Sequence, residues 1–134
     1  MKRHSTEWLA ALDAYVGDHA ERPFAWGPHD CCSWAAGWVQ QVRGADPMAD
    51  LRGYDTALSA GRVLASAGGL LAAVTARMGP PITGTMAQIG DVALVRHGQG
   101  LLSMGICIGP YIAAPGQSGL LMVSIARAEA AWRV

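Results

Sequence analysis

One stretch of the sequence gathers residue types that could carry out chemistry: PFAWGPHDCCSWAAGW, at 23–38. Pro23 and Pro28 fix their φ angles and lack a backbone N–H, so we expect a non-helical segment before His29. Asp30 can cap a helix that begins after it, because its carboxylate accepts hydrogen bonds from N–H groups of the first turn. Apolar residues then recur with the spacing of one buried helical face, namely Cys31, Trp34, Ala35, Trp38, Val39 and Val42.

This placement puts Cys31 at the positive end of a helix dipole. Such an environment lowers the pKa of a thiol from its usual value of about 8.5, as an activated cysteine nucleophile requires. The alternative is a capped helix that buries a small cysteine, since free cysteines are often buried. The stretch by itself leaves both interpretations open.

Composition limits the class of protein. With 134 residues, 51% of them hydrophobic and 15% charged, the chain is expected to fold as one domain over residues 1–134. Ten basic residues balance ten acidic ones, which argues against a nucleic-acid partner. The three cysteines, two of them adjacent, indicate neither a disulfide framework nor a metal site, and we expect no cofactor. We also expect no Sec signal and no membrane insertion, because no apolar run is long enough.

Helices are predicted first along the chain and strands later. Helical spacing covers about 6–20, after a cap at Ser5 or Thr6, then 31 to about Gly44, 57–66 and 70–78. Short apolar segments separated by glycine-rich turns predict strands at 89–97, 101–108, 111–114 and 120–125. Residues 48–55 and the tail 126–134 are ambiguous. The fold class is therefore α+β, with N-terminal helices (about 6–78) packed on a C-terminal antiparallel sheet (about 89–125).

Alternation along 101–108 divides that strand into a large-residue face and a small-residue face. The small face carries Ser103, Gly105 and Cys107, and we expect the Cys31 helix to approach the sheet there. Cys107 is then a packing residue, while Cys32 faces away from the apolar stripe and is expected to be partly exposed.

The order of three motifs resembles the NlpC-type family of papain-like cell-wall peptidases. These motifs are Trp26-Gly27-x-x-Asp30-Cys31, Gly90-Asp91-Val92 and Met104-Gly105-Ile106-Cys107-Ile108-Gly109. The resemblance covers about Phe24–Ile125. Within the family, the phrases WGPHDC, GADP, LRGYDT and AAWRV are similar to a branch carried by phages and prophages, often encoded beside tail-tip genes.

The resemblance implies a papain-like fold and assigns roles to three positions. In active members the cysteine attacks an amide between D-isoglutamyl and meso-diaminopimelic residues of peptidoglycan, a histidine acts as base, and a further polar residue orients it. These positions fall on Cys31, Ser103 and Ala113. Two of the three therefore depart from the family.

The departure removes the general base. A serine cannot accept the thiol proton near neutral pH, and general acid–base catalysis usually contributes about 10²–10⁴ in rate. An amidase built in this way should be very slow, and Cys31 would be a vestigial nucleophile.

His97 is the best substitute base in the sequence, although an exposed histidine at a hairpin tip is the favoured interpretation of this residue. If 98–100 is a three-residue hairpin loop, His97 pairs with Leu101 and shares a face with Ser103, about 7–8 Å away on the diagonal. A two-residue loop would turn His97 to the opposite face. His29 precedes the helix in a loop that would position an imidazole poorly, and His4 and His19 look like surface residues of the first helix.

Three functions remain open. The first is a structural subunit of a phage tail tip that keeps the peptidase-like fold without its chemistry. The second is an active cysteine peptidase on peptidoglycan stem peptides, with His97 or a neighbour's histidine as base. The third is a module that binds cell-wall fragments, with Trp26, Asp30 and Ser103 as candidate contact residues. The first is favoured. It implies other tail-tip proteins as partners, and a location in the host cytoplasm during assembly and then in the virion tail tip.

Overall fold

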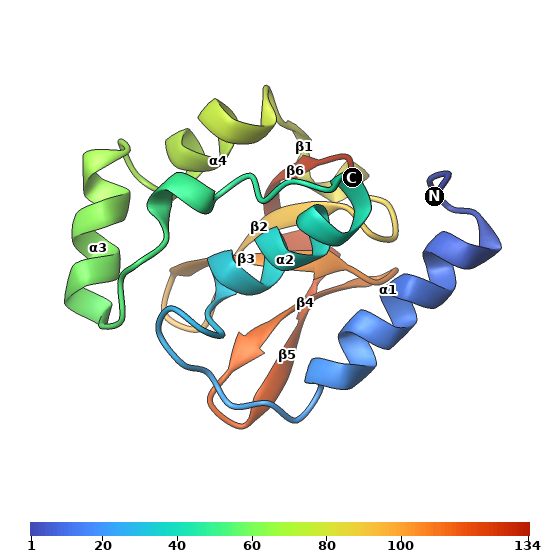
Figure 1. The fold of residues 1–134 in the computed structure, drawn as a ribbon, viewed down its shortest axis with the longest axis horizontal. Helices are drawn as coiled ribbons and strands as arrows, with labels where there is room; N and C mark the ends of the chain where they lie inside the picture. The colour runs from blue at the N-terminus through green and yellow to red at the C-terminus, as the bar shows by residue number, and fades with distance from the viewer.

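The computed structural model describes residues 1–134, with four α-helices before most of the sheet (Figure 1). The helices are α1 (Thr6–His19), α2 (Cys31–Arg43), α3 (Ala57–Ser66) and α4 (Leu70–Met78), with the short 3-10 helix η1 (Ala49–Leu51) between α2 and α3. The bounds of α3 and α4 agree with the sequence prediction. Side chains cap three of the helices, since Ser5, Asp30 and Thr56 accept hydrogen bonds from first-turn N–H groups.

The sheet is six-stranded and antiparallel, in the order β1-β6-β2-β3-β4-β5. Its strands are β1 (Ile82–Thr83), β2 (Val92–His97), β3 (Leu101–Cys107), β4 (Tyr111–Gly116), β5 (Gly119–Ser124) and β6 (Ala128–Trp132). The 3-10 helices η2 (Gly84–Met86) and η3 (Ile125–Arg127) precede β2 and β6. The α+β class is thus confirmed.

The predicted extent of the sheet is wrong at both ends. The tail is not a separate segment, because β6 inserts between β1 and β2 and pairs Ala131 with both Ile82 and Ala93. The alanine-rich tail carries a weak strand signal of its own, and long-range pairing decides its conformation.

The predicted approach of α2 to the sheet is also wrong. Helix α2 packs on the large-residue face of β3, where Met104 and Ile106 join Trp34 and Trp38 in the main core. Cys107 lies on the opposite face, in a smaller core with Ala93, Val95 and Ile112, next to Ile82, Ala87 and Ile125 of the segments around η2 and η3. A side chain on Gly105 would overlap the carbonyl of Ala113, so this glycine permits close approach of strand β4 rather than of α2.

Asp91, just before β2, connects both ends of the chain to the sheet. Its buried carboxylate pairs with Arg3 at 2.6 Å and accepts from the backbone N–H groups of Gln88 (2.8 Å) and Val134 (3.3 Å). Figure 1 shows the C-terminus close to β1 and β6, at one edge of the sheet.

No single helix is long and apolar enough to cross a membrane. Only α3 and α4 taken together, which are bent by 60° at the break between them, reach that length and apolarity.

Candidate functional site

Cys31 is the first residue of α2 and is partly exposed. Its sulfur lies 4.0 Å from that of Cys32 and accepts from the backbone N–H of Met104 in β3. The pKa of the Cys31 thiol is lowered, chiefly by hydrogen bonding from the Cys32 thiol and also by the N–H groups of Met104 and Cys32. Burial and the charge of Asp30 act in the opposite direction. The direction agrees with the sequence prediction, but its main cause is the neighbouring thiol and not the helix dipole.

Asp30 has the role that the sequence predicts for it. Its buried carboxylate accepts from the N–H of Ser33 (2.9 Å) and of Gly27 (2.8 Å), and the Ser33 hydroxyl completes a capping box. Burial, and after it the neighbouring Asp30 carboxylate, raise the pKa of the Tyr54 hydroxyl. The carboxylate of Asp30 holds the loop and the start of α2 together.

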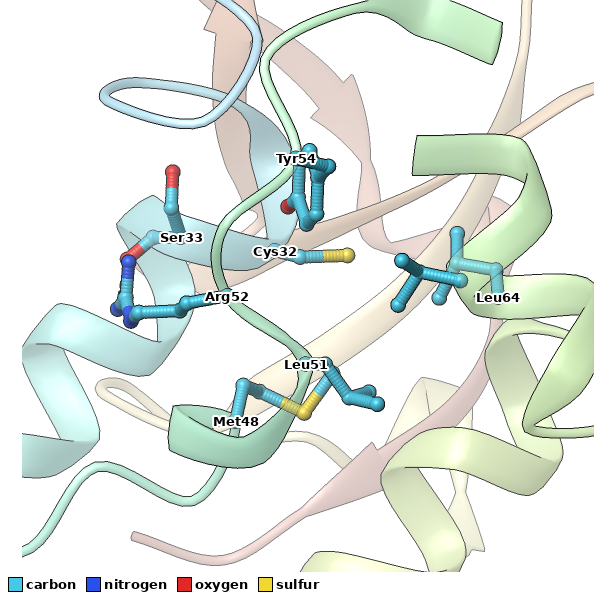
Figure 2. Close-up of a pocket in the computed structure, with 8 residues that line it drawn as sticks. Cys32, Ser33, Met48, Leu51, Arg52, Tyr54 and Leu64 are labelled. Carbon is cyan, nitrogen blue, oxygen red and sulfur yellow. Dashed lines mark hydrogen bonds between the residues drawn. The ribbon is translucent and has the colours of Figure 1, made fainter. Parts of the chain in front are cut away.

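Cys32 is buried, contrary to the prediction that it would be partly exposed. The segment 48–64, made of η1, a loop and the start of α3, covers it. Figure 2 shows its thiol pointing toward Leu64 across a space also lined by Met48, Leu51 and Tyr54. That space has room for about one water molecule. Burial and donation to Cys31 raise the pKa of the Cys32 thiol well above its usual range. It is a supporting donor and not a second nucleophile.

Ser103 and His97 lie together, as the three-residue loop requires. The register pairs His97 with Leu101 and Val95 with Ser103, and the His97 Nε2 lies 2.8 Å from the Ser103 Oγ. Both side chains project from the face of β2 and β3 opposite to Met104. Neither side chain hydrogen-bonds to Cys31. The next residue along the strand, Met104, is nevertheless close to Cys31 through its backbone N–H.

Ala113, at the position of the orienting residue, is a core residue. It pairs with Ile106 in β3 and Met122 in β5 and is 0% exposed. A polar orienting side chain is absent, and the surrounding packing leaves no room for one.

The other histidines make contacts elsewhere. His4 Nε2 bonds to the carbonyl of Ile89, and His19 Nδ1 donates to the carbonyl of Tyr15. His29 is not a mobile loop residue, as the sequence suggested, because it is 1% exposed and its Nε2 has no hydrogen-bond partner. No three His, Cys, Asp or Glu side chains gather in a way that would hold a metal ion.

Trp26 is the accessible aromatic group of this region. It is 40% exposed and packs edge-on against Phe24, at 4.7 Å between ring centroids. Beside it, Gly27, Arg52 and Tyr54 line an open hollow. Cys31 lines none of the five best-defined hollows of the molecule. Trp26 remains a candidate contact residue.

The sequence did not indicate two groups near the site, the Tyr54 side chain and the backbone N–H of Met104. Tyr54 lies in the unassigned segment 48–55, and it comes close to Asp30 and Cys32 only because the chain folds back after η1. The Met104 N–H belongs to the backbone, and no residue pattern identifies it. The LRGYDT phrase that contains Tyr54 is the only signal that could have drawn attention to the first of these.

Comparisons with known proteins agree with this geometry. The family described as "Domain of unknown function (DUF6950)" matches residues 2–134. Among solved structures, the chain is similar to the "NlpC/p60 domain of peptidoglycan hydrolase SagA", with a TM-score of 0.58 and 20% identity over 93% of this chain and 97% of that one. A search of curated proteins finds no match. At this identity the structural likeness establishes the NlpC/p60-like fold and no more.

Proposed function

This chain belongs to the family of the domain of unknown function DUF6950. We propose that it is a domain with an NlpC/p60-like fold that does not hydrolyse peptides. We propose further that it serves as a structural subunit of a phage or prophage tail tip. The observation that carries the proposal is the composition of the site. It has an acidic thiol at the start of α2 but a hydroxyl at the position of the base and a buried methyl group at that of the orienting residue.

Loss of the base is decisive for amide hydrolysis. A lowered thiol pKa supplies a nucleophile, but expulsion of an amine also needs a proton donor at the leaving nitrogen. No imidazole hydrogen-bonds to Cys31, and Cys31 does not line the space around Cys32 or the hollow beside Trp26. Both features support a domain that does not turn over peptide substrates.

An assembly role is supported by the surface and by the resemblance. Two adjoining open hollows, of about 420 and 570 Å³, share Leu9 of α1 and Ile89, and Val16 and Ile108 extend the apolar lining. Apolar patches with polar surroundings are typical of protein–protein contacts. The phrases WGPHDC and AAWRV, which resemble the phage and prophage branch, favour tail-tip proteins as the partners.

Mass spectrometry of purified stem peptides tests the catalytic half of the proposal. We expect no cleavage by the wild-type chain or by Cys31→Ala, beside an active NlpC/p60 enzyme that cleaves the same peptides. Cleavage by the wild type that disappears in Cys31→Ala would contradict the proposal.

Complementation tests the structural half. In the phage or prophage that encodes the chain, deletion should abolish complete tails, and Cys31→Ala should restore both tails and infectivity. Proteomic detection of the chain in purified tails provides the positive control. Normal tails that lack the chain would overturn the assignment to the tail tip.

One contact favours a hydrolytic alternative. The His97 Nε2 lies 2.8 Å from the Ser103 Oγ, within hydrogen-bonding distance. Ser103 occupies the position that the resemblance assigns to the base, so an imidazole lies next to that position. If His97 acts as a base through Ser103, cleavage exists and both His97→Gln and Ser103→Ala abolish it. The stem-peptide assay therefore distinguishes the two functions directly.

A further inference from the structure

The segment that joins α1 to α2, residues 21–29 (the connecting segment), buries a titratable group without satisfying it. His29 is 1% exposed, and its Nε2 is buried with no hydrogen-bond partner. A neutral imidazole tolerates this environment, whereas an imidazolium would bury an N–H and a charge with no acceptor.

The groups that face His29 make a charge there still less favourable. The His19 ring of α1 lies 5.7 Å away between centroids, and the Arg22 guanidinium acts on it from the connecting segment itself. Burial lowers the pKa of the His29 imidazole, Arg22 and His19 lower it further, and only Asp30 at the start of α2 opposes them.

The connecting segment is held by few backbone bonds. The Phe24 N–H donates to the carbonyl of Gly116 at 3.0 Å, and Ala25 and His29 exchange two bonds of 3.0 and 2.9 Å. The Gly27 N–H donates to the Asp30 carboxylate at 2.8 Å. The Arg22 N–H donates to the carbonyl of His19 at 3.2 Å, at the end of α1. A segment held by five such bonds can open locally at a much lower free energy than the whole fold.

We propose that the connecting segment is an acid-operated gate, in which uptake of one proton by the His29 imidazole releases the segment from the core and from the cap of α2, which Gly27 joins through the Asp30 carboxylate. The proton comes from solvent and no covalent bond changes. This gate is independent of whether the site hydrolyses peptides.

The sign of the pH dependence follows from linkage. In the closed segment the His29 pKa is depressed, and in the open segment it returns to about 6.5. The closed state is therefore fully stabilised above that value and loses its advantage as the pH falls below it. With His29 neutral in the closed state, the opening constant rises about tenfold between pH 7.5 and pH 5.5.

Amide hydrogen exchange, corrected for intrinsic rates, measures that constant at Phe24, Ala25, Gly27 and His29. We expect a rise of up to about tenfold at these four amides, the limit for a His29 that stays neutral in the closed state, and little change at the β2–β3 amides. His29→Gln and His29→Leu, which carry no titratable group there, should abolish the rise, while His97→Gln should leave it intact. A rise that survives both His29 variants, or an equal rise at the β2–β3 amides, overturns the gate.

NMR titration of the histidine rings in the wild-type chain makes the test independent of how the His29 variants fold. The His29 midpoint should lie below 6.5 and should move upward in Arg22→Gln and in His19→Gln, because each removes a neighbouring positive charge. The exchange midpoint should move with it. A His29 midpoint at or above 6.5 would contradict the proposal.

Discussion

At the scale of single residues, the adjacent cysteines have opposite characters. Cys31 is the partly exposed acceptor and Cys32 the buried donor, with 4.0 Å between their sulfurs. The acidity of Cys31 therefore depends on its neighbour more than on a histidine, which is the reverse of a cysteine peptidase site. The pair lowers the pKa of the Cys31 thiol without a contribution from a histidine.

Replacing Cys32 should make Cys31 less reactive. Cys32→Ala removes the largest contribution to the lowered pKa of Cys31, so alkylation of Cys31 by iodoacetamide at pH 6.5 should slow, by about tenfold for each unit by which the pKa rises. Peptide mass spectrometry assigns the modified thiol.

Two further variants separate this effect from a packing defect. Cys32→Ser keeps an O–H donor and should recover part of the rate, whereas Asp30→Asn removes a charge that opposes the thiolate and should increase it. Equal rates in the wild type and Cys32→Ala would contradict the role of the Cys32 thiol.

At the scale of elements, the turn before β2 is where α1, α2 and the sheet meet. Gly90 has φ +87°, and a Cβ on it would overlap the indole of Trp8 from α1. Its carbonyl accepts from the Trp38 Nε1 of α2 at 2.9 Å, and the two indoles pack edge-on at 5.3 Å. The glycine of the Gly90-Asp91-Val92 motif is therefore needed for packing, since only glycine lets the Trp8 indole lie this close to the backbone.

Gly90→Ala should lower the free energy of unfolding by about 3 kcal/mol or more, because it combines overpacking with a strained positive φ. Urea denaturation followed by tryptophan fluorescence measures the loss.

Gly61→Ala is the matched control for that substitution. Gly61 lies in α3 with nothing near its Cβ position, and alanine there should stabilise the protein by about 0.5–1 kcal/mol. If the free energy of unfolding changed no more in Gly90→Ala than in Gly61→Ala, the close contact with Trp8 would be shown to be unimportant.

At the scale of the whole molecule, Asp91 joins residues that are far apart in the sequence. Its carboxylate is 0% exposed and binds Arg3, which also donates to the carbonyl of Val134 at 2.6 Å. The ion pair of Arg96 with Glu129, by contrast, joins β2 to β6 on the open surface. Buried charge networks and exposed ion pairs are expected to differ strongly in their effect on stability.

Asp91→Asn should lower the free energy of unfolding by about 2 kcal/mol or more, because the amide leaves one of the donors around it unsatisfied. Glu129→Gln should leave the denaturation midpoint unchanged within error, since solvent screens that pair. Similar midpoints for both variants in one urea titration would contradict the distinction.

The sequence by itself determined the features that depend on neighbours along the chain. Asp30 followed by helical apolar spacing predicts the capped start of α2, and the glycines after residues 66 and 78 predict the ends of α3 and α4. For the hairpin after β2 the sequence leaves a two-residue and a three-residue loop open, and the structure has the three-residue loop 98–100, which pairs His97 with Leu101.

Tertiary structure alone decided which faces and segments meet. Alternation along β3 gives two faces but does not say which one contacts α2, and the tail acquires its conformation only by pairing with β2. Cys32 and His29 are buried because η1, α1 and the connecting segment cover them. Local propensity and periodicity act within about one turn or hairpin, whereas burial is set by contacts between residues dozens of positions apart. These contacts bury Cys32, leave Cys31 partly exposed and place no histidine in hydrogen-bonding contact with it.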